Sequence, residues 1–134
     1  MPMDYKDKRG FSFRRLLYSF RQAFTGIKEV LLHEQNMKIH LMMALAAILL
    51  AIWFNIPKEH WLILIILIGI VLSLEAMNSA IERTVDLVTK EYQPLAKAAK
   101  DAASAAVLIF SIVAVIVGII IFFPPFIEWL QEGW

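Results

Sequence analysis

Cysteine is absent from the 134-residue sequence, so disulfide bonds, thiolate metal sites and cysteine nucleophiles are excluded. No P-loop, GxGxxG or HExxH motif occurs, and neither does a repeat or a low-complexity tract. The first apolar run follows a polar, basic stretch (Met1–Gly10) and an amphipathic one, which does not match the pattern of a cleavable signal peptide. Lysine and arginine are missing after the last long apolar run, an asymmetry that bears on membrane orientation.

The chain is unusually rich in apolar residues. Sixty per cent of its residues are hydrophobic, and its mean hydropathy is +0.66. A single domain of this length could not bury so much apolar surface in water. The composition therefore predicts an all-α integral membrane protein.

Three apolar runs predict transmembrane helices over residues 39–56, 61–90 and 102–123. Nothing breaks the second run, so we expect one helix that continues out of the membrane on the cytoplasmic side. Tyr92-Gln93-Pro94 is expected to end it and to open a loop that leads through Lys97, Lys100 and Asp101 into the third span. Pro124-Pro125 is expected to end the third span, followed by a short amphipathic tail in which Trp134 lies at the membrane interface.

Residues 11–35 carry apolar side chains at three- and four-residue steps, with basic side chains on the other faces. This pattern is typical of an amphipathic helix lying on a membrane surface. An ordinary soluble helix is the alternative.

The distribution of positive charge predicts the topology. Eight of the thirteen lysines and arginines precede the first span, one lies in the turn after it, and four lie between the second and third spans. The positive-inside rule then places the N-terminus in the cytoplasm and the C-terminus on the outer side of the membrane. No feature predicts a nucleic-acid partner.

The stretch from Glu75 to Asp86 is the most distinctive. In a helix that turns by roughly 100° per residue, Glu75, Asn78, Glu82 and Asp86 share a sector of about 80°. Carboxylates this close repel one another, and some lie near lipid depth, where a bound cation or proton would relieve the cost. We interpret this acidic stripe as a functional site; a solvated helix face just outside the membrane is the alternative.

Other residues expected on the same side of the membrane indicate which chemistry the acidic stripe could support. Glu34, at the edge of the first span, could join the stripe in binding Mg²⁺, which prefers carboxylate, water and phosphate oxygens. Lys100, beside Asp101, offers an ammonium for phosphate. Glu75 lies nearest the hydrocarbon, where it could accept a proton from a lipid-embedded alcohol during phosphoryl transfer. His33, His40 and His60 are interpreted as hydrogen-bonding residues at the membrane interface.

The motif Glu75-x-x-Asn78-Ser-Ala-Ile-Glu82-x-x-Val-Asp86, with Glu91-Tyr92 and Ala99-Lys100-Asp101-x-x-Ser104, resembles the prokaryotic diacylglycerol kinase family. The resemblance implies a surface helix and three transmembrane helices, a homotrimer with active sites shared between subunits, and a lipid alcohol, ATP and Mg²⁺ as reaction partners. It implies that Glu75 is the general base, that Glu34 and Glu82 bind metal, and that Asn78 and Ser104 help to bind the lipid. The nucleotide contacts that it implies are Asp86, Glu91, Lys100, Asp101 and Arg15.

Within that family, the segments around Ser19–His40 and Pro94–Asp101 resemble the undecaprenol kinases of Gram-positive bacteria. His33 before the first metal-binding glutamate and Gln93 after the Glu-Tyr pair depart from the pattern of the Gram-negative enzymes. We therefore expect an undecaprenol kinase; a diacylglycerol kinase that makes phosphatidic acid is the alternative. A cation channel or transporter and a scaffold subunit are hypotheses from other classes.

Overall fold

A computed structural model describes residues 12–132, and these residues form four α-helices and no strand. The expectations for Met1–Gly10 and for Trp134 lie outside this range. The chain divides into two units, one containing the first helix and the other beginning at Glu34. The all-helical class is as predicted.

Helix α1, Phe13–His33, is the first unit. It is one uninterrupted helix with large exposed apolar side chains, including Phe20 and Phe24. The helix was expected from the three- and four-residue spacing of these side chains. Its position on a membrane surface stays a prediction.

Glu34 separates α1 from α2, which spans Gln35–Trp53. Glu34 has an extended backbone (φ −96°, ψ 120°) and is the N-cap of α2, although its side chain makes no capping hydrogen bond. The helix therefore begins before the predicted span at residue 39 and includes the polar residues that precede it. This leaves the carboxylate of Glu34 available for other contacts.

Helix α2 ends in a Schellman motif, which forms the turn between α2 and α3. Ile56 donates its backbone N–H to the carbonyl of Ala51, and Asn55 donates to that of Ile52, both at 3.2 Å. Asn55 has a left-handed backbone (φ 48°), a conformation that asparagine tolerates better than most residues. Ile56 then packs with Ala51 in the apolar core, and Pro57 is the N-cap of the next helix. The turn lies where the sequence predicted it, before the span that was expected to begin at residue 61. However, residues 58–60, which were expected to belong to the turn, are the first residues of α3.

Helix α3, Lys58–Val88, is continuous over 31 residues. This agrees with the expectation of one helix running from the apolar run through the acidic stripe. Its buried residues Leu64, Leu67 and Val71 lead directly to Glu75. One rigid element thus carries the functional motif from the apolar core toward the loop after Val88.

Helix α4, Pro94–Glu132, differs from the prediction at both ends. Lys97, Lys100 and Asp101 lie in the helix, and the expected loop before residue 102 is wrong. Proline suits the first turn of a helix, and the alanine-rich segment after it has high helix propensity. The helix also continues through Pro124 and Pro125, so the expected end there is wrong as well. Proline removes only its own backbone donor and fixes a helix-compatible φ, which transmembrane helices tolerate.

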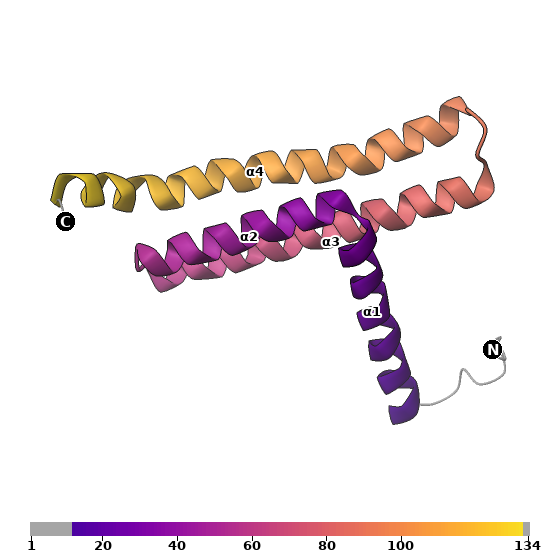
Figure 1. The fold of residues 1–134 in the computed structure, drawn as a ribbon, viewed down its shortest axis with the longest axis horizontal. Helices are drawn as coiled ribbons and strands as arrows, with labels where there is room; N and C mark the ends of the chain where they lie inside the picture. Colours follow the sequence, from indigo (N-terminus) through magenta and orange to yellow (C-terminus); the bar gives the residue numbers. More distant parts are fainter. Residues whose placement is uncertain (1–11, 133–134) are drawn as a thin grey trace. The chain divides into compact units, whose positions relative to one another are not determined.

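Helices α2, α3 and α4 pack on one another, and α3 and α4 run side by side over most of the length of α3 (Figure 1). A core of Ala51, Ile56, Leu64 and Ile121 joins all three at one end. Many large apolar side chains on their outer faces are exposed, such as Leu62, Ile116 and Ile120. Among the described residues, these three helices are long and apolar enough to cross a membrane.

Candidate functional site

The acidic stripe runs from the interior of the helix bundle to its surface. Glu75 is 2% exposed and Asn78 is 5% exposed, Glu82 is half-buried, and Asp86 is exposed. If the stripe were a solvated helix face, all four residues would be exposed. The burial of Glu75 and Asn78 does not agree with that alternative. A buried carboxylate needs partners, and the neighbouring helices supply polar groups.

Asn78 is at the centre of a polar chain between α3 and α4. Its amide nitrogen donates a hydrogen bond to Oε1 of Glu82, one helical turn later, at 3.0 Å. The hydroxyl of Ser104 on α4 donates to Oδ1 of Asn78 at 3.5 Å. Asn78 thereby fixes the orientation of the Glu82 carboxylate, while Ser104 restrains the asparagine from the opposite helix.

Polar contacts from α2 reach Glu75 as well. Asn36 and, one turn further along α2, His40 are close enough to the Glu75 carboxylate to act on its charge. Glu34 and Glu82 also act on this charge. The sequence had assigned His40 to the membrane interface, and the structure adds Asn36 and His40 to the surroundings of the proposed base. Both residues lie in the segment that resembles the undecaprenol kinases, but their relation to Glu75 arises only when α2 packs against α3.

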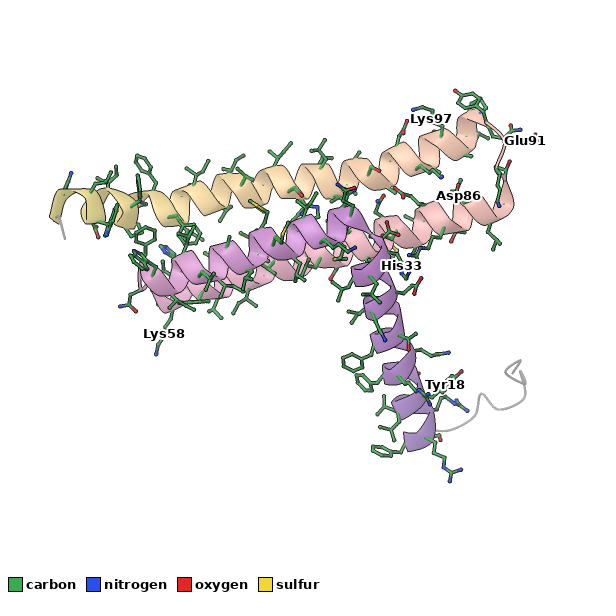
Figure 2. The ribbon with its side chains drawn as sticks, in the orientation of Figure 1. Tyr18, His33, Lys58, Asp86, Glu91 and Lys97 are labelled. Carbon is green, nitrogen blue, oxygen red and sulfur yellow. The ribbon has the colours of Figure 1, made fainter. Side chains whose placement is uncertain are left out.

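An ion pair connects the outer end of the stripe to α4. Lys100 Nζ and Asp86 Oδ1 are 2.5 Å apart, whereas Lys97 pairs with Asp101 one turn later on the same helix. Figure 2 shows Asp86 and Lys97 near the end of α3 and α4 at which the connecting loop lies. Lys100 and Asp101, adjacent in sequence, thus have different partners, and the site has two positive charges at this end.

A second ion pair joins the N-cap residue of α2 to α3. Nη2 of Arg83 lies 3.0 Å from Oε1 of Glu34 and donates a hydrogen bond to it. Arg83 directly follows Glu82, so this contact brings the two predicted metal-binding glutamates to the same region of the bundle. Arg83 was not among the residues predicted for the site, because nothing in the local sequence pattern indicates a partner 49 residues away.

The other two predicted nucleotide contacts belong to other parts of the chain. Glu91 is exposed in the loop after α3, where its backbone N–H donates to the hydroxyl of Thr89 at 3.2 Å. Arg15 belongs to α1, the separate unit, where its carbonyl accepts a hydrogen bond from Ser19. Their roles at the nucleotide stay predictions.

The donor set fits a divalent ion that shares its ligands with a phosphate. Between residues 12 and 132, no three His, Asp or Glu side chains are grouped so that they could hold a metal by themselves. Mg²⁺ typically takes only one or two carboxylates and completes its shell with water and phosphate oxygens. Glu34 and Glu82 could supply those carboxylates, with Asn78 fixing the second.

An apolar groove lies at the opposite end of α2 and α4. It has a volume of about 540 Å³ and is lined by aliphatic and aromatic residues, namely Leu50, Trp53, Phe54, Ile119, Phe122, Phe123, Phe126 and Trp129. Phe126 and Trp129 stack with their ring centroids 6.3 Å apart. The groove has no acidic or basic side chain in its lining. The groups suited to acid–base and phosphate chemistry are those around Glu75.

Comparison with known proteins gives a consistent result. The family model described as prokaryotic diacylglycerol kinase matches residues 21–122. The chain is 43% identical to the undecaprenol kinase of Bacillus subtilis over 122 residues, which covers 91% of this chain and 98% of that protein. It is 33% identical to the diacylglycerol kinase of Escherichia coli over 114 residues, or 85% and 93% of the two chains. It is 38% identical to the diacylglycerol kinase of a Synechocystis species over 84% of this chain and 65% of that protein.

Proposed function

The chain belongs to the prokaryotic diacylglycerol kinase family, and we propose that it is a lipid kinase that transfers the γ-phosphate of ATP to the hydroxyl of undecaprenol. The observation that carries this proposal is the buried Glu75 at the inner end of a line of polar groups that reaches the surface at Asp86. A lipid hydroxyl can approach such a carboxylate from the membrane, and a nucleotide can approach the outer groups from water.

The reaction follows from these positions. The hydroxyl oxygen of the lipid attacks the γ-phosphorus and forms a new P–O bond, while the bond from that phosphorus to the β–γ bridging oxygen breaks. The electron pair of the broken bond leaves with ADP. Glu75 accepts the hydroxyl proton, since its side chain is the carboxylate buried deepest along the stripe. The transfer requires positioning and charge neutralisation more than covalent participation by the protein.

The remaining residues bind and orient the nucleotide. A magnesium ion, when bound, would supply positive charge that offsets the negative charge of the phosphates. Glu34 and Glu82 would hold it, and Asn78 keeps Glu82 oriented through the hydrogen bond described above. Lys100 would contact phosphate as an ammonium, with Asp86 holding it in place. Asp101, Glu91 and Arg15 are the further proposed contacts to the nucleotide.

Diacylglycerol is the second candidate substrate, because proteins named diacylglycerol kinase share 33–38% identity with this chain. Identity is higher to the undecaprenol kinase of Bacillus subtilis, and that match covers more of this chain, which supports the polyprenol. The channel and scaffold hypotheses offer no account of this similarity to kinases.

We further propose that the protein is a homotrimer in the plasma membrane, with its N-terminus in the cytoplasm and its C-terminus outside. The distribution of basic residues supports this orientation. Exposed apolar side chains cover the outer faces of α2, α3 and α4 and are available for contact with lipid or with other copies. Three helices can shield only a few carboxylates from lipid. Helices from additional copies of the chain would enclose the acidic stripe more completely.

Purified protein in detergent, incubated with ATP, Mg²⁺ and one lipid at a time, tests the activity. We expect phosphorylated undecaprenol, and a smaller amount of phosphatidic acid from diacylglycerol. A reversed preference would support the second candidate. Absence of phosphorylated product from both lipids would contradict a lipid kinase function.

A further inference from the structure

Arg83 is a charged side chain at the candidate site that the proposed reaction does not use. It donates a hydrogen bond to Glu34, one of the two proposed metal-binding residues, and it directly follows the other, Glu82. The two residues are 49 positions apart in the sequence, and their ion pair joins α3 to the residue that precedes α2. A cation of the protein thus lies against a carboxylate that a divalent metal ion would also use.

We propose that Arg83 couples metal binding to nucleotide binding. In the nucleotide-free protein, its guanidinium holds the Glu34 carboxylate and opposes the binding of a free divalent ion. When the nucleotide binds, Arg83 exchanges this carboxylate for the polyphosphate, and Glu34 turns to the metal. This inference rests on the proposed function, because it takes Glu34 and Glu82 as the metal-binding pair.

Because both side chains of the ion pair are accessible to water, such an exchange costs little folding free energy. The side chains of Arg83 and Glu34 are 45% and 28% exposed. Ion pairs with this access to water contribute little to stability, since solvent screens them and two side chains must be ordered. A metal ion or a phosphate can therefore replace either partner without a large loss in folding free energy.

Electrostatics sets the direction of the coupling. A guanidinium and a divalent cation on the same carboxylate repel each other, so Arg83 disfavours metal that arrives alone. A bound nucleotide reverses this effect, because its polyphosphate is negative and matches the planar set of donors of arginine. Metal and nucleotide then bind better together than the metal binds alone.

A purely structural role for Arg83 leads to different expectations. If the pair only fastened α2 to α3, loss of Arg83 would loosen the site and weaken metal and nucleotide binding together. The two roles therefore predict opposite changes in the affinity for free metal.

The test measures binding and does not depend on turnover. Mn²⁺, as a spectroscopic substitute for Mg²⁺, is titrated into nucleotide-free protein and followed by electron paramagnetic resonance. Calorimetry measures the binding of a non-hydrolysable ATP analogue with Mg²⁺. For Arg83→Gln we expect about two- to fivefold tighter Mn²⁺ binding and about tenfold weaker binding of the nucleotide.

Two further variants complete the comparison. Arg83→Lys keeps the positive charge, so its Mn²⁺ affinity should stay near that of the wild type, while its nucleotide affinity should fall severalfold because an ammonium lacks the planar donor set. Lys58→Gln removes one positive charge from an exposed position at the other end of α3 and should change neither constant. Circular dichroism and oligomer size check folding, and Arg83→Lys carries the test if Arg83→Gln does not fold.

Mn²⁺ binding that is unchanged or weaker in Arg83→Gln would overturn the inference, as would unchanged nucleotide affinity. Lipid phosphorylation by the wild type separates this failure from failure of the proposed function. An active wild type with unaltered binding in the Arg83 variants overturns the coupling alone. An inactive wild type overturns both.

Discussion

The amide nitrogen of Asn78 donates a 3.0 Å hydrogen bond to Oε1 of Glu82 within the partly buried segment of α3. Asn78 is itself held from α4 by Ser104. The side chain therefore connects the inner part of the stripe, where Glu75 lies, with the proposed metal-binding carboxylate. This arrangement makes Asn78 a positioning residue for Glu82.

Substitution of Asn78 by alanine should weaken the use of Mg-ATP more than it weakens the use of lipid. Loss of the hydrogen bond frees the Glu82 carboxylate to adopt other rotamers, so the KM for Mg-ATP should rise about five- to tenfold. Ser73→Ala on the same helix removes a hydroxyl that donates a hydrogen bond to the carbonyl of Gly69 and serves as the matched control. Equal KM values for Mg-ATP in the two variants would contradict this positioning role.

Glu34→Gln and Glu82→Gln should each reduce the apparent affinities for Mg²⁺ and for ATP together. The metal and the nucleotide form one charge-balanced unit, so a lost carboxylate affects both. Steady-state rates over a grid of Mg²⁺ and ATP concentrations measure the effect. Glu59→Gln, an exposed change in the first turn of α3, controls for the loss of a negative charge. An unchanged Mg²⁺ dependence in both variants would remove these residues from the metal site.

Mixing of two inactive variants tests whether active sites are shared between subunits. At Mg²⁺ and ATP concentrations that just saturate the wild type, Glu75→Gln and Glu34→Gln should each have little activity alone. In mixed trimers, some sites would receive the intact residue from each parent if the two residues come from different subunits, and part of the activity should return. The variants are unfolded, mixed, refolded and assayed, with each variant refolded alone as the control. Mixed oligomers that never regain activity would contradict an active site that takes Glu34 and Glu75 from different subunits.

The sequence predicted the parts of this site that lie on one helix. Glu75, Asn78, Glu82 and Asp86 repeat with the helical period, and the absence of a break in α3 follows from its composition. Burial of Glu75 and Asn78 was consistent with their place next to the apolar run. Such local periodicity needs no knowledge of the other helices.

The contacts between helices could not be predicted in the same way. Arg83 meets Glu34 and Lys100 meets Asp86 only because α2, α3 and α4 pack in a particular register. His40 was assigned to the membrane interface for the same reason, since only the packing of α2 brings it near Glu75. The helical segment from Pro94 to Asp101 was missed because Tyr92-Gln93-Pro94 was expected to open a loop, whereas proline suits the first turn of a helix and the alanines after it favour one.

Glu75 is the residue on which the proposed mechanism depends. An alcohol has a pKa far above neutrality, so its proton must leave as the new P–O bond forms, and a positioned base typically contributes about 10²–10⁴-fold to the rate. Glu75→Gln keeps the size of the side chain but cannot accept this proton. Glu75→Asp withdraws the carboxylate by one methylene from a hydroxyl anchored in the membrane, so it should be severely impaired too.

The most direct measurement is the turnover rate of wild type, Glu75→Gln and Glu75→Asp at saturating undecaprenol and Mg-ATP, with Glu59→Gln as the charge control and oligomer size as the check on folding. The proposed mechanism predicts that Glu75→Gln lowers turnover by at least about a hundredfold while the affinities for ATP and lipid stay nearly unchanged. A well-folded Glu75→Gln protein that retains about a tenth or more of wild-type turnover would contradict the assignment of Glu75 as the general base.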